Sequence, residues 1–203
     1  MNPQINIGVL ALQGAFREHI KALQALGVNA LEVRLPHQLH GLAGIIIPGG
    51  ESTTIGKLAV QYELIEPLRA FSAQGKPVWG TCAGAIFLSK EVGRNQPLLH
   101  LMDITVQRNA FGSQIDSFET DLAIQGVADA EHPFHCIFIR APLIEKVGAQ
   151  VRVLARLPQD GNTTNGIVAA QQGHLLATSF HPELTNDLRF HQYFLSLTER
   201  NHE

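Results

Sequence analysis

Cysteine is scarce in this sequence, because its 203 residues include only Cys82 and Cys136. Two thiols are too few for a disulfide framework, and their separation does not match the paired spacing of structural zinc ligands. His132, His135 and Cys136 lie close together, but alternate strand residues point apart and no distant further ligand is identifiable. We therefore expect a reducing compartment, and neither a bound metal nor another cofactor.

An excess of charge of one sign is also lacking, since 15 basic and 18 acidic side chains give a formal net charge of -3. That balance excludes the strong positive field of a nucleic-acid-binding protein. No apolar run is long enough to cross a membrane, and the first residues lack the basic region and cleavage site of an export signal. We expect a soluble, cytoplasmic protein with no nucleic-acid or membrane partner.

Short apolar runs alternate with amphipathic segments in the first half of the chain. Runs rich in branched residues predict buried strands at 5–12, 30–35, 43–48 and 77–81. Helices are predicted between and after them, at 15–26, at 53–74 with an interruption at 62–67, and at 83–92. In the first helix, a spacing of three and four residues places four apolar side chains on one face, which we expect to face the core: Phe16, Ile20, Leu23 and Leu26. This alternation is typical of a parallel α/β sheet.

The second half of the chain is rich in short strand candidates separated by turn residues. They are predicted at 101–108, 118–124, 136–141, 144–147, 151–157, 167–171 and 175–180. Asn186 or Asp187 can cap a last helix whose inward positions include His191 and Phe194. We expect residues 1–203 to form one three-layer α/β domain, with a mostly parallel central sheet flanked by helices and additional antiparallel strands.

The first chemical motif is G-x-C-x-G, which runs from Gly80 to Gly84 between a predicted strand and a predicted helix. A sharp turn there requires small flanking residues and lifts Cys82 above the sheet as a nucleophile. The backbone N–H of Ala83 then faces the same space, and the helix N-terminus favours the thiolate. A buried, packing cysteine is the alternative interpretation.

A cysteine nucleophile needs a base, and His181 stands out among ten histidines because it follows a predicted strand within Phe-His-Pro-Glu. Pro182 biases His181 toward an extended backbone, in which the side chains of residues 181 and 183 project to the same side. Glu183 can then orient the imidazole. A strand-end turn with a solvated glutamate is the alternative, and we expect most of the other histidines to be surface or packing residues.

A third motif places paired glycines, Gly49 and Gly50, directly after a buried strand and before Glu51. Glycine allows backbone N–H groups to turn toward a developing oxyanion, so Gly50 and Ala83 are the predicted donors of an oxyanion hole. A phosphate-binding loop fits less well, because the G-x-x-x-x-G-K-[ST] pattern is absent and the Glu51 carboxylate would repel phosphate. A simple chain reversal is the remaining alternative.

Together these motifs resemble the triad class of glutamine amidotransferases. Finer strings resemble one branch, the glutaminase subunits of pyridoxal 5'-phosphate synthase, and they extend from near Ile5 to the last helix: A-L-Q-G at 11–14, P-G-G-E-S-T-T at 48–54, Q-R-N-A-F-G at 107–112, F-I-R-A-P at 138–142 and A-T-S-F-H-P-E-L-T at 177–185. Several motifs in the expected order make this resemblance far more specific than any one of them.

The resemblance implies a single glutaminase domain that hydrolyses L-glutamine to L-glutamate and ammonia. It assigns Cys82 as nucleophile, His181 as general base and acid, and Glu183 as the orienting carboxylate. The ammonia would pass through a channel to a synthase subunit of (β/α)8 fold in a hetero-oligomer, for pyridoxal phosphate (vitamin B6) biosynthesis. Glutamine contacts carried over by matching position are Gly49, Gly50, Glu51, Arg108, Ile139 and Arg140.

Two alternatives stay open at this stage. Another amidotransferase glutaminase, such as that of histidine biosynthesis, would share the triad. A non-catalytic, regulatory binding protein could keep the same fold, because a fold does not by itself imply chemistry.

Overall fold

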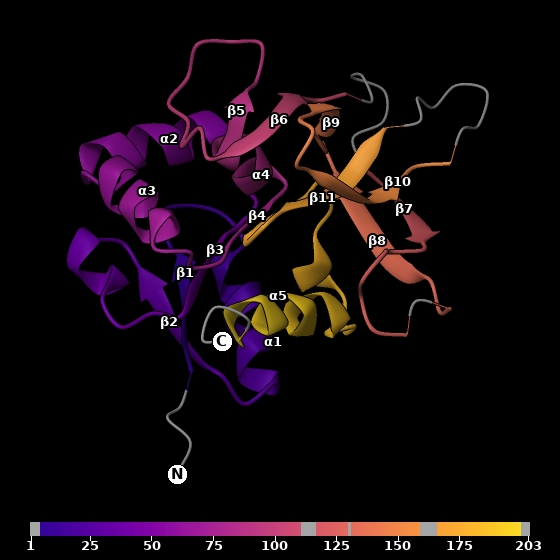
Figure 1. Cartoon of the computed structure of the whole chain (residues 1–203), viewed down its shortest axis with the longest axis horizontal. Helices are drawn as coiled ribbons and strands as arrows, with labels where there is room; N and C mark the ends of the chain where they lie inside the picture. Colours follow the sequence, from indigo (N-terminus) through magenta and orange to yellow (C-terminus); the bar gives the residue numbers. More distant parts are fainter. Residues whose placement is uncertain (1–4, 111–116, 130, 159–165, 200–203) are drawn as a thin grey trace.

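A ten-stranded sheet organises the residues described by this computed structural model, which are 5–110, 117–129, 131–158 and 166–199. Its strands are β1 (Asn6–Leu10), β2 (Asn29–Val33), β3 (Gly44–Ile47), β4 (Val78–Thr81), β5 (Ser89–Glu91), β6 (Met102–Gln107), β9 (Leu143–Val147), β10 (Arg152–Arg156), β11 (Ile167–Gln172) and β12 (Leu175–Thr178). The strand order is β2-β1-β3-β4-β12-β11-β9-β6-β5, and β10 pairs with β11 outside this path (Figure 1).

The first part of the sheet, from β2 to β12, is parallel throughout. Its central strands are apolar on both faces: Ile45 and Ile47 pack into the core on one side, and Ile46 packs into the core on the other. Strands buried on both faces read as continuous apolar runs because neither face meets water. The predicted parallel, buried strands are therefore confirmed.

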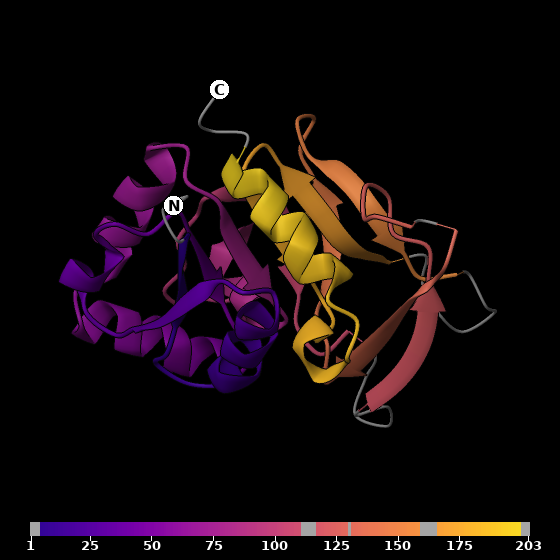
Figure 2. The same cartoon turned by 90° about the horizontal axis from the view of Figure 1, so that it is seen from below.

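Helices cover both faces of this parallel region (Figures 1 and 2). One face carries α2 (Ser52–Gln61), α3 (Ile65–Ala73) and α4 (Ala83–Leu88). The other face carries α1 (Phe16–Ala25) and α5 (Arg189–Glu199). The described residues also form two short 3-10 helices, η1 (Pro36–Leu39) and η2 (Pro182–Leu184). The predicted three-layer arrangement is confirmed.

Antiparallel strands extend the sheet beyond β12, as the second half of the sequence predicts. β11 pairs antiparallel with β12, β9 and β10, and β9 pairs antiparallel with β6. A separate antiparallel pair is formed by β7 (Ser117–Leu122) and β8 (Phe134–Ile139). In Figure 2, α5 lies between the parallel α/β part and this strand-rich part.

Two local predictions are wrong in detail. The helix predicted at 83–92 ends at Leu88, because the Ser89 hydroxyl bonds to the carbonyl oxygen of Ile86 and the chain then pairs with β6 as β5. In α1 the buried face is rotated from the predicted stripe, so that His19 is buried with Leu23 while Phe16 is only half-buried. Packing between distant segments of the chain decided both cases, and apolar spacing alone could not predict that packing.

No helix in the described part of the chain is both long and apolar enough to cross a membrane. Two residues of the quoted sequence motifs, Phe111 and Gly112, lie outside the described residues.

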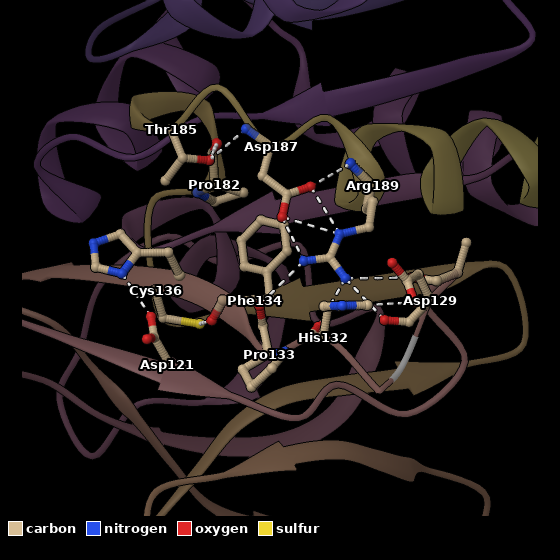
Figure 3. Close-up of polar contacts among 12 residues, drawn as sticks. Asp121, Asp129, His132, Pro133, Phe134, Cys136, Pro182, Thr185, Asp187 and Arg189 are labelled. Atoms are coloured by element: carbon tan, nitrogen blue, oxygen red, sulfur yellow. Dashed lines mark hydrogen bonds and ion pairs between the residues drawn. The ribbon is translucent and has the colours of Figure 1, made fainter.

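A single arginine joins α5 to the loop that precedes β8. The Arg189 guanidinium pairs with Asp187 at 2.6 Å and donates to the carbonyl oxygens of Asp129, His132 and Pro133 at 3.0, 2.8 and 3.2 Å (Figure 3). The planar fork of donors suits such convergent acceptors. Arg189 thereby fixes the chain between η2 and α5 against the hairpin.

Replacing Arg189 tests this connection. Arg189→Met keeps much of the aliphatic stem but removes the charge-assisted bonds, so we expect a loss of about 2 kcal/mol of unfolding free energy. Chemical denaturation followed by circular dichroism measures it. Arg94→Met, at an exposed position, is the matched control and should change stability by less than about 0.5 kcal/mol. Equal effects of the two substitutions would contradict the role assigned to Arg189.

Candidate active site

Cys82 lies at the sharp turn between β4 and α4. Its backbone has φ 48° and ψ -107°, an uncommon conformation for a residue with a side chain. The flanking glycines permit the turn: a Cβ on Gly84 would lie 1.9 Å from the carbonyl oxygen of Ile47, and one on Gly80 would lie 2.4 Å from the carbonyl oxygen of Gly84. The predicted strand–turn–helix elbow is therefore confirmed.

His181 and Glu183 form a buried pair beside this turn, with Nδ1 of the histidine 2.7 Å from Oε1 of the glutamate. The predicted contact is present, but the predicted extended backbone at Glu183 is wrong, because Pro182 opens the 3-10 helix η2. Proline starts a helical turn readily, since its fixed φ suits the first position. The tight turn, not a strand, brings the two side chains together.

The ionisation of this group follows from its contacts. Burial lowers the pKa of His181, but hydrogen bonds with Cys82 and Glu183 outweigh it and raise that pKa to about 10. Burial raises the pKa of Glu183, but the nearby His19 and the hydrogen bond from His181 lower it overall. Glu183 is thus a carboxylate that accepts a hydrogen bond from Nδ1–H of His181, which leaves Nε2 of His181 to face Cys82.

Backbone contacts hold His181 in place. Its N–H donates to the carbonyl oxygen of Ile137 in β8, at 2.9 Å. The Thr185 hydroxyl closes η2 by bonding to the carbonyl oxygen of Pro182 at 3.0 Å, and it also accepts from the Asp187 N–H (Figure 3). The Arg189 contacts then continue from Asp187 to the loop before β8. The histidine is consequently fixed by the hairpin as well as by the sheet.

A cavity of about 400 Å³ opens above Cys82. Nine of the ten residues singled out from the sequence line it, and only Glu183, buried behind His181, does not. The residues that line the cavity are Gln13, Gly14, Ala15, Gly49, Gly50, Glu51, Ser52, Cys82, Ala83, Ile86, Arg108, Asn109, Ile139, Arg140, Pro142, His181 and Leu184. Tertiary folding thus gathers residues from six separate sequence motifs into one site.

The paired glycines lie against the triad. A Cβ on Gly49 would stand 2.4 Å from Cε1 of His181 and 3.2 Å from the Cβ of Cys82, so only glycine fits there. The carbonyl oxygen of Gly49 accepts from the Ala15 N–H at 3.0 Å. Because a trans peptide directs its N–H opposite to its C=O, the N–H of Gly50 points away from Ala15.

Glu51 and Arg108 contact one another across the cavity, at 3.0 Å between Oε1 and the guanidinium. Glu51 is also the N-cap of α2 and accepts from the backbone N–H groups of Thr53 and Thr54. Burial raises the pKa of Glu51, but the hydrogen bonds from Thr53 and Thr54 together outweigh it and lower the pKa to about 2. A negative and a positive group therefore stand side by side at one end of the cavity.

Ile139 ends β8 at the rim of the cavity, and Arg140 follows it. The carbonyl oxygen of Ile139 lies 3.9 Å from Sγ of Cys82, and its exposed side chain stands at the opening. Arg140 has a left-handed backbone, with φ 43°, which turns the chain at this rim. Its guanidinium makes no ion pair within the described ranges.

The second cysteine, Cys136, does not line the cavity. Cys136 is fully buried in β8, its Sγ lies 3.5 Å from the carbonyl oxygen of Phe134, and burial raises the pKa of its thiol. A thiol in such surroundings is unreactive. Cys136 is therefore a packing residue of β8. Over the described ranges, no group of three or more His, Cys, Asp and Glu side chains is arranged to hold a metal ion.

Two groups near the site were missed or placed differently by sequence reasoning. His19 is fully buried, with Nε2 3.4 Å from Oε2 of Glu183, and the only available signal was its position one helical turn before the buried Leu23. Gln13 lines the cavity, and its Oε1 accepts from the Glu51 N–H at 2.7 Å. Contacts between distant segments define both roles.

The comparisons with known proteins agree with this geometry. The model of the SNO glutamine amidotransferase family matches residues 9–200. A curated relative from Herpetosiphon aurantiacus, named pyridoxal 5'-phosphate synthase subunit PdxT, is 58% identical over 197 residues, which cover 95% of this chain and 100% of the relative. A relative of the same name from Moorella thermoacetica is 55% identical over 194 residues, covering 95% of this chain and 99% of its own.

Solved structures extend the likeness to three dimensions. A crystal structure described as a glutamine amidotransferase is 49% identical, with a TM-score of 0.87, and the match covers 95% of this chain and 98% of that chain. The PurLQS structure from Thermotoga maritima, at 17% identity and a TM-score of 0.71, shares the fold alone, over 96% of this chain and 99% of that chain. This chain belongs to the SNO glutamine amidotransferase family.

Proposed function

We propose that this chain hydrolyses L-glutamine to L-glutamate and ammonia as the glutaminase subunit of a pyridoxal 5'-phosphate synthase. The observation that carries the proposal is the hydrogen-bonded series Cys82, His181 and Glu183, with the thiol at the floor of the cavity. Relatives at 58% and 55% identity bear the corresponding subunit name and favour this branch over the histidine-biosynthesis glutaminase. The intact series supports an enzyme over a non-catalytic binding protein.

The reaction proceeds in two halves. The Cys82 thiolate attacks the side-chain amide carbon of glutamine, and the N–H groups of Gly50 and Ala83 stabilise the resulting oxyanion. The His181 imidazolium gives its Nε2 proton to the departing nitrogen, so that ammonia leaves and a γ-glutamyl thioester remains. His181 then takes a proton from water, whose oxygen attacks the thioester and releases glutamate. Glu183 holds the imidazole in the tautomer that both halves require.

The charged groups of the cavity match the two ends of an amino acid. The α-ammonium of glutamine would lie near Glu51, and its α-carboxylate would pair with Arg108 or with Arg140 at the rim. Gly49 and Ile139 would supply backbone contacts to the side-chain amide beside Cys82. Arg108 already contacts Glu51 at 3.0 Å, so glutamine would insert its own two charges into an existing pair.

Delivery of ammonia requires a partner. Free ammonia becomes protonated in water, so we propose a closed route to a synthase subunit of (β/α)8 fold in a hetero-oligomer. We propose residues 1–203 as one glutaminase domain, acting in the cytoplasm, where a catalytic thiol stays reduced. The substrate pair is glutamine and water, and no metal or other cofactor enters the proposed reaction.

Removal of the nucleophile tests the chemistry. Cys82→Ala should lower the rate of glutamate release by at least about a thousandfold, measured with the synthase subunit present, because no thioester can form. Cys136→Ala is the matched control and should keep the wild-type rate, since Cys136 lies outside the cavity. Undiminished release by the Cys82→Ala variant would remove Cys82 from the mechanism.

Dependence on the partner is a second prediction. An incompletely assembled oxyanion hole would prevent wasteful hydrolysis by the isolated subunit, so addition of the synthase should raise the glutaminase rate by about tenfold or more. Steady-state glutamate release is compared with and without purified synthase at saturating glutamine. Similar rates in both conditions would contradict activation by the partner.

The lowered pKa of Glu51 predicts that the stability of the fold depends on pH. Its pKa in the fold, about 2, is below the ordinary 4.5, so its contribution to stability is complete above about pH 4.5 and is lost as the pH falls toward 2. Loss of this cap in Glu51→Gln should lower the melting temperature at pH 7 by about 2–4 °C.

Thermal unfolding at pH values from 7 to about 3 measures this effect, and the difference from wild type should shrink in the acid range. Glu145→Gln, at an exposed position of β9, is the control and should change the melting temperature by less than about 1 °C. A difference for Glu51→Gln that stays constant down to the lowest pH would show that the charge of Glu51 does not stabilise the fold.

A further inference from the structure

Two buried histidines lie behind the catalytic series, and the mechanism above does not use them. His19 on α1 and His191 on α5 are both fully buried, and Nδ1 of His19 lies 3.0 Å from Nε2 of His191. Trp79 of β4 packs edge-on against both rings. The two imidazoles come from segments 172 residues apart, and the fold holds them in contact inside the protein.

This histidine pair reaches the triad through Glu183. Oε1 of Glu183 is engaged by His181 at 2.7 Å, while Oε2 is buried and accepts no hydrogen bond within the described ranges. Nε2 of His19 stands 3.4 Å from that second oxygen, and both side chains are completely shielded from solvent. A buried carboxylate oxygen is costly unless a proton donor or positive potential faces it, and His19 occupies that position.

The positions of the protons follow from chemistry. An ionised carboxylate can only accept, so His19 must carry its proton on Nε2 to face Glu183 favourably. Nδ1 of a neutral His19 is then an acceptor, and the Nε2–H of His191 supplies its hydrogen bond. The remaining nitrogen of His191, Nδ1, is buried without a partner within the described ranges, as an unprotonated nitrogen in an apolar site would be.

The surroundings of both rings agree with the neutral forms. Burial lowers the pKa of His19, although Glu183 raises it in part, and burial with the nearby His19 lowers the pKa of His191 well below its ordinary value. The Thr81 hydroxyl, next to Cys82 in the chain, lies 3.2 Å from Nε2 of His19 and can accept from it. The ionisable groups that influence His19 are Glu183, His181, Glu18 and His191.

We propose that His19 is a positioning residue of the glutaminase, which acts through Glu183. Its Nε2–H lies between the Thr81 hydroxyl, at 3.2 Å, and the second carboxylate oxygen of Glu183, at 3.4 Å. The positive end of this N–H bond favours the ionised form of Glu183 and leaves the other oxygen to His181. His191 fixes the tautomer of His19 from behind. The series therefore runs from Cys82 through His181 and Glu183 to His19 and His191. This inference rests on the proposed glutaminase function and extends it beyond the three residues of the triad.

Two amide substitutions separate positioning from packing. Glutamine places its NH₂ group where His19 carries Nε2, whereas asparagine reaches only the position of Nδ1. His19→Gln should therefore keep the donor that faces Glu183, and His19→Asn should lose it. Both variants are polar, and they differ by one methylene group. Leu23→Ala, which removes packing from the same buried face of α1, is the control for a purely structural defect.

The first readout is glutaminase kinetics with the synthase present. His19→Asn should lower kcat by about tenfold or more and leave KM for glutamine within about twofold, because Glu183 acts on the histidine and not on the substrate. His19→Gln should recover most of the loss in kcat. Leu23→Ala should lower the melting temperature but keep kcat. Equal kcat values for the Asn, Gln and Leu23→Ala proteins would overturn the proposal.

The second readout needs no turnover and keeps the proposal testable by itself. The rate of Cys82 alkylation by iodoacetamide is measured against pH, with Cys82→Ser to show that the buried Cys136 does not contribute. If Glu183 is less readily ionised, the imidazolium is less stabilised, and the midpoint for His19→Asn should move up by about one pH unit. His19→Gln and Leu23→Ala should keep the wild-type midpoint.

The two readouts distinguish the two proposals. Failure of the wild-type protein to release glutamate, with a shifted alkylation midpoint in His19→Asn, would refute the proposed function and leave the contact between His19 and Glu183 intact. Active wild-type protein with an unshifted midpoint in His19→Asn would refute the role of His19 alone.

Discussion

The carboxylate of Glu183 carries a charge that is wholly enclosed by protein, and the arrangement of the site depends on how that charge is satisfied. A buried carboxylate is tolerated only where donors and positive potential surround it. His181 meets one oxygen at 2.7 Å, and His19 stands behind the other at 3.4 Å. The 3-10 turn and the hairpin contact of His181 place His181 beside this carboxylate, and the position of α1 places His19 behind it.

The second constraint is steric and lies at the elbow. The chain passes so close to itself that a Cβ at Gly84 would overlap the carbonyl oxygen of Ile47, and a Cβ at Gly49 would overlap His181. These close approaches connect β3, β4 and η2 at the carboxyl ends of parallel strands, where open α/β sheets place their sites. Cys82 is consequently aimed at His181 by the backbone, before any contact of its own side chain is considered.

Much of this arrangement was predictable from the residues. The triple isoleucine run showed that β3 is buried on both faces, and G-x-C-x-G between a strand and a helix located Cys82. The contact between His181 and Glu183 was also predicted, although through the wrong backbone argument, since Pro182 begins a 3-10 turn. Local sequence patterns report on local geometry, so they succeed where the chemistry depends on neighbouring residues.

The sequence by itself determined the class of fold, the elbow cysteine and its histidine and glutamate partners, because each depends on short-range spacing and on residue types with few roles. Only the tertiary structure decided that Glu51 faces Arg108, that Gln13 bonds to the Glu51 backbone and that His19 lies behind Glu183. These contacts join residues 38, 57 and 164 positions apart, the last being the difference between 183 and 19. No periodicity records such distances, since they arise when helices and strands pack together.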